Sequence, residues 1–310
     1  MPAPRILVAA SINVDLVARA DEAPAAGDLV HGTGFEMSLG GKGANVAVQV
    51  ARSGGVPEIV ASVGQDTLGD FALAELGRRG VATDTILRAP THTGVGHVWV
   101  DRDGEYRGII VAGANAVPAA DPERLRALAA TCGAAVVQFE SAAEVLDTLL
   151  SLSGGGCRIH LNPSPFDAAL AAASADRCDV LVVNRSEARR VAEAAGATVP
   201  PDADARTLAD LLLANTRRID EVVITLGPDG AFAATRDGRS ASAAAPPVEV
   251  VGTIGAGDAF LGEYVVGRSS GLDLAAALTR ACAAGALATT LPGAQADAAT
   301  RAAIDTLAVR

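Results

Sequence analysis

Residues 250–260 read V-V-G-T-I-G-A-G-D-A-F, and this stretch is the strongest single indication of the fold. Apolar residues lead into Gly255-Ala256-Gly257, after which Asp258 opens a run typical of a helix. The pattern predicts a strand that ends in a tight turn and passes into a helix N-terminus. Small residues let a ligand approach the backbone closely, and the first N–H groups of a helix have no partner within it. The turn is therefore a candidate anion-binding site.

Asp258 has two interpretations at this position. It can stabilise the helix N-terminus, where an acidic side chain interacts favourably with the helix dipole. It can equally act as a general base beside a cradle for an oxyanion or a phosphate. The stretch alone does not separate a structural acid from a catalytic one.

A second glycine-rich turn, S-L-G-G-K-G-A-N over residues 38–45, precedes another predicted helix that reaches Arg52. It is not a P-loop, because no glycine stands five residues before Gly41-Lys42 and no Ser or Thr follows the lysine. Neither turn contains G-x-G-x-x-G, the fingerprint of dinucleotide-binding folds. The chain therefore belongs to neither of these two phosphate-binding classes.

Together the two turns resemble the two signatures of the ribokinase-like (PfkB) family of carbohydrate kinases, G-G-K-G-A-N and G-A-G-D. The resemblance extends over nearly the whole chain. It implies an α/β fold with a parallel sheet flanked by helices on both faces and a small β-sheet lid over the sugar site. It also implies an ATP-dependent kinase that transfers the γ-phosphate to a sugar hydroxymethyl group.

Composition and charge agree with one enzyme domain spanning residues 1–310. A net charge of −11 argues against a nucleic acid or an anionic membrane surface as partner. The four cysteines show no C-x-x-C spacing and are interpreted as buried hydrophobes in a reducing compartment. The N-terminus runs directly into a predicted strand, and no apolar run reaches ~18 residues, so we expect a cytoplasmic protein without a transmembrane helix.

Strands and helices alternate between about residues 134 and 226, which predicts parallel strands joined by right-handed crossovers. Ligands bind outside the carboxyl ends of such strands. Four predicted strands end in polar side chains: Gln138-Phe139-Glu140, Asn162-Pro163-Ser164-Pro165, Asn184 with Glu187, and Thr225 with Gly227 and Gly230. Each has a structural explanation of its own, such as a capping box from Ser141 to Glu144 or a turn followed by a first-turn acid at Glu187.

Four β-type runs predict a small separate sheet, at about residues 12–18, 28–37, 93–100 and 105–112. Arg102-Asp103-Gly104 between the last two is a hairpin signal. Asn13 and Asp15 stand two apart and so share one face of their strand, either as a solvated edge or as ligand-binding groups. In the family this sheet is the lid and often a dimer surface, so the resemblance predicts a homodimer. Trp99 lies in the predicted lid, where it either takes part in that function or is only an apolar anchor of the sheet.

The resemblance implies a role for each matching residue. Asp258 is the expected base, and the N–H groups of Gly255, Ala256 and Gly257 are expected to hold the developing negative charge. The expected sugar-binding residues are Asn13, Asp15, Gly41, Lys42, Asn45, Glu140 and Asp258. The expected nucleotide-binding residues are Asn184, Thr225, Gly227, Gly230 and Gly257. Mg²⁺ is expected to arrive with ATP under the indirect influence of Glu187, since the chain offers no dedicated carboxylate cage.

Two positions depart from the family pattern. The second signature usually opens with Asp, whose carboxylate helps to hold an activating K⁺; this chain has Gly252, so K⁺ activation is expected to be weak or absent. Asp297, just beyond the predicted turn at residues 292–295, is a candidate for supplying the missing charge. Cys282 stands where the family often has His or Asn near the adenine, in a helix whose many Ala and Gly residues also suit close helix packing.

The substrate can be narrowed only by the resemblance. G-G-K-G-A-N, A-G-A-N at residues 112–115 and Q-F-E at residues 138–140 look more like the ribokinases than like fructokinases or nucleoside kinases. The expected reaction is conversion of D-ribose to ribose 5-phosphate, with a nucleoside or another sugar as the alternative substrate. A sugar-binding regulator without turnover is the alternative from another class, but Asp258 and the anion turn that such a protein would have lost are intact.

Overall fold

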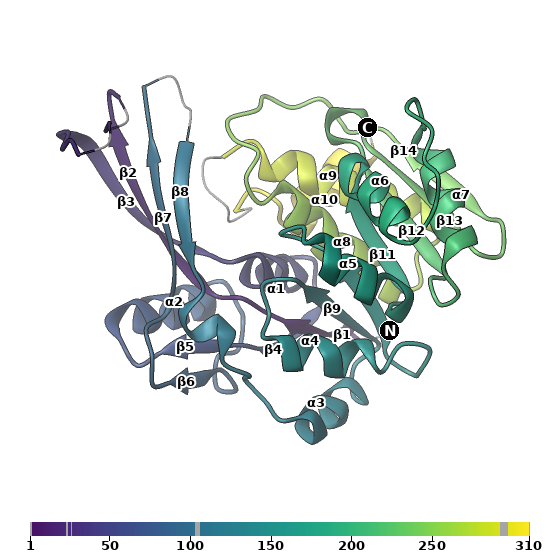
Figure 1. The fold of residues 1–310 in the computed structure, drawn as a ribbon, viewed down its shortest axis with the longest axis horizontal. Coiled ribbons are helices and arrows are strands. Elements are labelled where there is room, and N and C mark those ends of the chain that lie inside the picture. Colours follow the sequence, from purple (N-terminus) through teal and green to yellow (C-terminus); the bar gives the residue numbers. More distant parts are fainter. Residues whose placement is uncertain (1, 23, 26, 103–105, 292–296, 310) are drawn as a thin grey trace.

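A computed structural model describes residues 2–22, 24–25, 27–102, 106–291 and 297–309. Its largest element is an eight-stranded sheet with the order β14-β13-β12-β11-β10-β9-β1-β4 (Figure 1). The strands are β1 (Arg5–Ala9), β4 (Val56–Val60), β9 (Ala134–Gln138), β10 (Arg158–Asn162), β11 (Val180–Asn184), β12 (Glu221–Thr225), β13 (Ala231–Thr235) and β14 (Ser240–Ala243). The strands from β4 to β12 pair in parallel, so their carboxyl ends meet at one edge of the sheet.

The predicted α/β fold is confirmed with one difference, because the sheet is mixed and not wholly parallel. Strands β13 and β14 pair antiparallel with their neighbours. Only a short turn, η3 (Gly227–Asp229), separates β12 from β13. A connection of this length can join antiparallel strands but not parallel ones, which need a crossover of a dozen or more residues.

Helices cover both faces of the sheet. One face carries α1 (Lys42–Arg52), α2 (Thr67–Arg78), α8 (Ala256–Ser269) and α9 (Leu274–Ala288), and the other carries α3 (Pro122–Ala129), α4 (Ala143–Leu150), α5 (Ala168–Ser174), α6 (Arg185–Ala194) and α7 (Ala205–Asn215). Alternate residues of β1 show this division, since Ile6 and Val8 enter the first core and Leu7 and Ala9 the second. Helix α10 (Arg301–Ala308) packs on α9. None of the helices in the described ranges is both long and apolar enough to cross a membrane.

A four-stranded sheet stands apart from the larger one, at the upper left of Figure 1, in the order β3-β2-β7-β8. Its strands are β2 (Asn13–Ala20), β3 (Gly32–Gly40), β7 (Gly94–Val100) and β8 (Tyr106–Val111). Strand β2 is internal to this sheet, so Asn13 and Asp15 do not mark a solvated edge. The strand predicted at residues 28–37 begins four residues later and extends to Gly40. Asp103 and Gly104 of the predicted hairpin turn lie outside the described residues, as does the turn predicted at residues 292–295.

The strand predicted before Gly255 is absent. Val250 and Val251 are 60% and 59% exposed. The N–H groups of Val251 and Gly252 donate to the Thr289 carbonyl at 2.8 and 3.1 Å, which holds this loop against the end of α9. The segment has the local composition of a strand, but none of the described strands pairs with it. Strand β4 is followed by β5 (Ser62–Gly64), which pairs with β6 (Leu87–Ala89).

The far half of α8 is fixed to the sheet by a buried acid. Glu221 of β12 is 1% exposed, accepts a hydrogen bond from the Tyr264 hydroxyl at 2.7 Å and pairs with Arg268 at 2.8 Å. Burial by itself would raise the pKa of Glu221, but the hydrogen bonds from Arg268 and Tyr264 outweigh it and hold the pKa below its usual value. This contact fixes the helix whose first turn carries Asp258.

Replacing Tyr264 by Phe should lower the free energy of unfolding by about 1.5–3 kcal/mol, because a buried hydrogen bond to a charged group is lost. Urea denaturation of the variant and of the unmodified protein measures this change. Equal stability of the two would show that the hydroxyl of Tyr264 does not contribute to the anchoring of α8.

Candidate active site

Asp258 lies in the first turn of α8 and is only 7% exposed. Its two carboxylate oxygens accept hydrogen bonds from two different elements: Oδ2 from the Asn45 amide of α1 at 2.8 Å and Oδ1 from the Gln138 amide of β9 at 3.3 Å. Burial raises the pKa of Asp258, and the charge of Lys42 and these two amide donors oppose the rise. Asp258 is therefore more than a cap, since its side chain joins α1, α8 and the end of β9.

The N-terminus of α8 is open to a ligand. Gly255 adopts the left-handed conformation at φ 80°, and a Cβ built on Gly257 would meet no atom within 4 Å. Among the described residues, no acceptor faces the backbone N–H groups of Gly255, Gly257 and Asp258, while that of Ala256 donates only to the Thr253 carbonyl at 3.4 Å. These unsatisfied groups and the helix dipole favour an anion here.

The N-terminus of α1 differs, because its N–H groups are already occupied. That of Lys42 donates to Glu140 Oε2 at 3.1 Å, that of Gly43 to Ser11 Oγ at 3.3 Å and that of Ala44 to the Ser11 carbonyl at 3.0 Å. Ser11 Oγ in turn donates to Glu140. Glu140 is thus held by the turn before α1. The alternative of a capping box from Ser141 to Glu144 does not hold, since α4 begins after Ala142 and Ser141 Oγ donates to the Ala9 carbonyl at 3.0 Å. Of the two glycine-rich turns, only that of α8 can receive an anion.

Close backbone approach fixes the α1 turn. Gly41 has φ 92°, and a Cβ there would lie 2.5 Å from the Ser11 carbonyl oxygen. A Cβ on Gly43 would lie 2.2 Å from the Cα of Ala10. Glycine is thus required at both positions, by conformation at Gly41 and by space at Gly43. The approach places Asn45 and the Lys42 side chain beside the carboxyl ends of β1 and β9.

Asn13 and Asp15 reach the site from the internal strand of the smaller sheet. Asn13 is buried and accepts a hydrogen bond from the Asn115 amide at 2.7 Å. Asp15 is flanked by Gly40 and Gly96, where an added Cβ would lie 2.3 Å from a carboxylate oxygen in each case. Burial, and secondly the charge of Glu140, raise the pKa of Asp15 to about 6. The structure thus brings the predicted sugar-binding acids close enough to influence one another.

The predicted nucleotide-binding residues gather at the neighbouring strand ends. Asn184 and Thr225 are paired in register at the carboxyl ends of β11 and β12, and Gly227 and Gly230 follow in the next turn. Asn184 and Glu187 form a capping box for α6, with hydrogen bonds of 2.8 and 2.9 Å, so the structural interpretation of this pair is correct. Burial raises the pKa of Glu187, and the charge of Lys42 opposes this. Lys42 therefore acts electrostatically on both Glu187 and Asp258.

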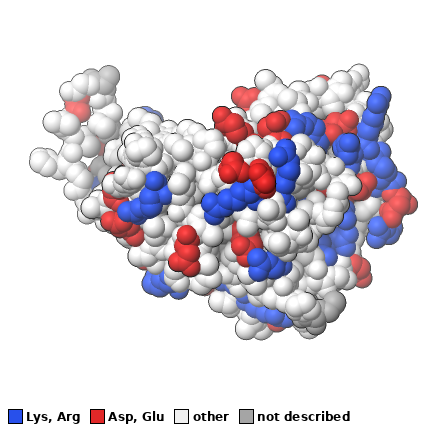
Figure 2. Space-filling view, turned by 90° about the horizontal axis from the view of Figure 1, so that it is seen from below, with Lys and Arg blue, Asp and Glu red and all other residues white. Residues whose placement is uncertain are grey.

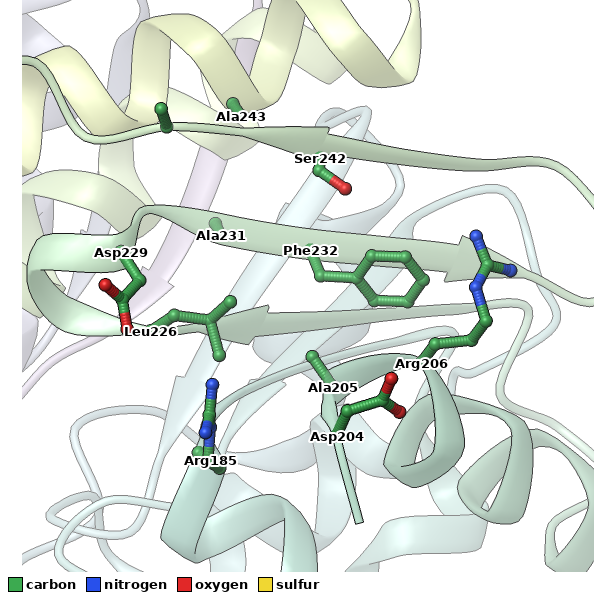
Figure 3. A pocket seen from close by; sticks show the side chains of 11 residues that line it. Arg185, Asp204, Ala205, Arg206, Leu226, Asp229, Ala231, Phe232, Ser242 and Ala243 are labelled. Carbon is green, nitrogen blue, oxygen red and sulfur yellow. The ribbon is translucent and has the colours of Figure 1, made fainter. Parts of the chain in front are cut away.

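A pocket of ≈ 500 Å³ adjoins this second group, with Arg185, Leu226 and Asp229 among its lining residues (Figure 3). Figure 3 shows Phe232 and Ser242 projecting from the strands toward the same hollow as Arg185 and Asp204. The predicted nucleotide-binding residues do not line it, and its lining comes from both faces of the sheet, with Phe232 from the core on the α3–α7 side and Ala231 from the core on the α8 side. The site is therefore identified by convergent side chains and not by this hollow.

Four residues of the site were given no role by the sequence: Ser11, Asn115, Gln138 and Asn162. The last two are paired in register on β9 and β10, and Gln138 donates to Asn162 Oδ1 at 2.9 Å. The position of Gln138 and Asn162 at strand ends was the one feature of the sequence that could have pointed to a place in the site. A buried polar side chain needs a hydrogen-bond partner, but the sequence does not say which one.

The assembled groups suit transfer of a phosphoryl group. A buried carboxylate that can accept a proton lies in the same helical turn as unsatisfied backbone donors, and a lysine acts on it from the facing turn. Such transfer depends mainly on positioning and on stabilisation of negative charge. The polar side chains of Asn13 and Asp15 reach the site from the smaller sheet.

Comparison with known proteins agrees with this geometry. The family model for pfkB family carbohydrate kinases matches residues 3–301. Ribokinase of Schizosaccharomyces pombe is 32% identical over 268 residues, which cover 84% of this chain and 83% of the relative. Ribokinase of Bacillus subtilis is 32% identical over 305 residues, 96% of each chain. The crystal structure of ribokinase from Cryptococcus neoformans in complex with ADP is 27% identical, with a TM-score of 0.84 and coverage of 98% and 99%. The chain belongs to the pfkB family of carbohydrate kinases.

Proposed function

We propose that this protein is an ATP-dependent kinase that phosphorylates the hydroxymethyl group of D-ribose to give ribose 5-phosphate. The observation that carries the proposal is Asp258, a buried acid held by Asn45 beside the open N-terminus of α8. The names of the two relatives that are 32% identical over most of their length support ribose as the sugar.

In this proposal Asp258 accepts the proton of the attacking hydroxyl, and the N–H groups of Gly255, Ala256 and Gly257 stabilise the charge that develops on the transferred phosphoryl group. Asn13, Asp15, Gly41, Lys42, Asn45 and Glu140 hold the sugar. Asn184, Thr225, Gly227 and Gly230 contact the nucleotide. The smaller sheet acts as a lid that excludes water and so limits ATP hydrolysis.

The residues present fit an Mg²⁺ ion that arrives with ATP. No group of three or more His, Cys, Asp or Glu side chains converges on a possible metal position in the described residues. Glu187 already accepts the Asn184 N–H at 2.9 Å, which suits an indirect influence through water. The bound ion would neutralise phosphate charge and help to orient the γ-phosphate.

We also propose that the lid joins two copies of the chain. Phe35 of β3 is 71% exposed, and Ile109 and Ile110 of β8 are each 62% exposed, so apolar side chains are exposed on both outer strands of the smaller sheet. In Figure 2 the end of the molecule at the left, where this sheet lies, is mostly uncharged, whereas charges of both signs intermingle over the larger body. An exposed apolar surface of this kind suits a protein–protein interface.

A cytoplasmic location belongs to the same proposal. The reaction needs ATP, and Cys132, Cys157, Cys178 and Cys282 are all free and buried, as suits a reducing compartment.

The proposed role of Gly252 concerns K⁺. Of the residues that the structure describes, a Cβ there would approach only Leu291, whose carbonyl oxygen is 3.9 Å away, so these residues leave room for an Asp side chain. Asp297, the other candidate for supplying charge, pairs with Arg52 and with Arg79. A cation near the positive end of the α8 dipole thus lacks a free carboxylate from either candidate position.

The central test is release of ADP by the purified protein in a screen of pentoses, hexoses and nucleosides. D-ribose should give the highest kcat/KM, and Asp258→Asn should lower kcat by about 10²–10⁴-fold, because a positioned base is lost. Circular dichroism checks that the variant is folded. Turnover at the unmodified rate would make Asp258 a structural residue, and a nucleoside as best substrate would replace ribose in the proposal.

Asp15→Ala should raise KM for D-ribose by more than about tenfold and leave KM for ATP nearly unchanged, because a buried charged acceptor is lost. In the unmodified protein, KM for ribose should also rise as the pH falls through about 6, where the Asp15 carboxylate gains a proton. That pH step should be absent from Asp15→Ala and present in the control Asp28→Ala, whose acid is exposed. A change confined to KM for ATP would reverse the assignment of the two substrate sites.

Replacing NaCl by KCl at fixed ionic strength should change the initial rate of the unmodified protein little, and Gly252→Asp should gain K⁺ activation. The added carboxylate compensates the charge of the ion beside the helix N-terminus. Gly257→Asp is not a suitable control because it alters the anion turn, so Gly252→Asn, which has the same size without the charge, is used. A several-fold activation by K⁺ without any substitution would contradict the proposal.

A further inference from the structure

We infer that Gln138 and Asn162 form an amide relay that positions Asp258 and keeps its carboxylate ready to accept a proton. The inference rests on the proposed role of Asp258 as base. Gln138 and Asn162, at the ends of β9 and β10, have no role in the proposed reaction, and the inference gives them one.

Three hydrogen bonds in series make the relay. The Asn162 amide nitrogen donates to the Val182 carbonyl at 2.9 Å, Gln138 Nε2 donates to Asn162 Oδ1 at 2.9 Å, and the same Nε2 donates to Asp258 Oδ1 at 3.3 Å. The relay therefore begins at a main-chain group of β11 and crosses β10 and β9. Because its first acceptor is a main-chain carbonyl of the sheet, the Asn162 end of the relay is fixed to β11.

Only one orientation of each amide satisfies these contacts. The Val182 carbonyl can only accept, so Asn162 turns its NH₂ group toward β11 and its oxygen toward Gln138. Gln138 must then present its NH₂ group to Asn162, and the second N–H faces Asp258. A flipped Gln138 would place its oxygen against the oxygens of both Asn162 and Asp258. The relay thus presents a donor to Asp258 and excludes an acceptor.

Burial makes this donor important for the charge on Asp258. Gln138 is 1% exposed, so water does not replace it readily. The charged groups that act on Asp258 are Lys42, which favours its ionised form, and Glu140, which opposes it. The amides of Asn45 and Gln138 then supply one donor to each carboxylate oxygen. Removing the donor on Oδ1 destabilises the carboxylate relative to the neutral acid.

The test is the pH profile of kcat, measured at saturating D-ribose so that the effect of Asp15 on KM does not enter, in Gln138→Met, a substitution that keeps length and volume and removes the amide. The acid limb, where Asp258 loses activity by gaining a proton, should move up by about one pH unit, so that the rate below the limb falls about tenfold. Above the shifted limb most of the unmodified rate should return. Asn162→Ala should shift the limb in the same direction by less, because Gln138 is then held at one end only.

Gln49→Met is the matched control. Gln49 is also 1% exposed, its Nε2 donates to Ser53 Oγ and to the Ala299 carbonyl, each at 3.0 Å, and its Oε1, like that of Gln138, has no partner within the described residues. The control therefore reproduces the loss of a buried amide without a contact to Asp258. An acid limb at the same pH in Gln138→Met and Gln49→Met would overturn the inference, even if both variants lost stability.

A titration of Asp258 that needs no substrate separates this inference from the proposed function. Protein labelled with ¹³C at the aspartate carboxyl carbons is titrated by NMR, and Asp258→Asn identifies the signal of interest. The pKa of Asp258 should be higher in Gln138→Met than in Gln49→Met. If the unmodified protein phosphorylates no sugar, the proposed function fails, but an unchanged pKa of Asp258 is the result that refutes the relay.

Discussion

The hydrogen bond from Asn45 to Asp258 joins residues 213 positions apart and holds a buried carboxylate where two helix N-termini meet. A buried charge is costly unless donors surround it, so both helices must approach within hydrogen-bond distance of one point. That requirement explains Gly43, whose added Cβ would lie 2.2 Å from the Cα of Ala10, and the left-handed Gly255 that directs α8. The eight-stranded sheet keeps the two turns at one edge.

Much of this arrangement could be predicted, because its signals are local. Glycine-rich turns followed by helical runs identified both helix N-termini, and alternating strands and helices placed Gln138, Asn162, Asn184 and Thr225 at a common edge. Asn13 and Asp15 stand two residues apart, so that their side chains share one face as soon as the segment is recognised as a strand. Period and turn chemistry fix such features without knowledge of distant partners.

The errors concern features that depend on distant partners. Residues 250–254 are apolar enough for a strand, yet no neighbouring strand is available and the segment stays an exposed loop. Glu187 accepts a hydrogen bond from Asn184 in its own turn, whereas Glu140 accepts hydrogen bonds from Ser11 and from the N–H of Lys42, which are distant in sequence. Glu140 and Glu187 both follow the end of a strand in the sequence. Which donor an acid meets is decided by packing, and one sequence does not specify it.

The glycines beside Asp15 set limits on how this enzyme could acquire another substrate. The usual way to reshape a binding site is to exchange small neighbouring side chains for larger ones, but any side chain at Gly40 or Gly96 would overlap a carboxylate oxygen. A mutational path that enlarges either position must therefore displace the Asp15 carboxylate or replace Asp15. With Asp15 in its proposed role as a ligand of the sugar, selection for a new acceptor would pass through variants that bind the old one less well, which makes gradual broadening of specificity from this side of the site difficult.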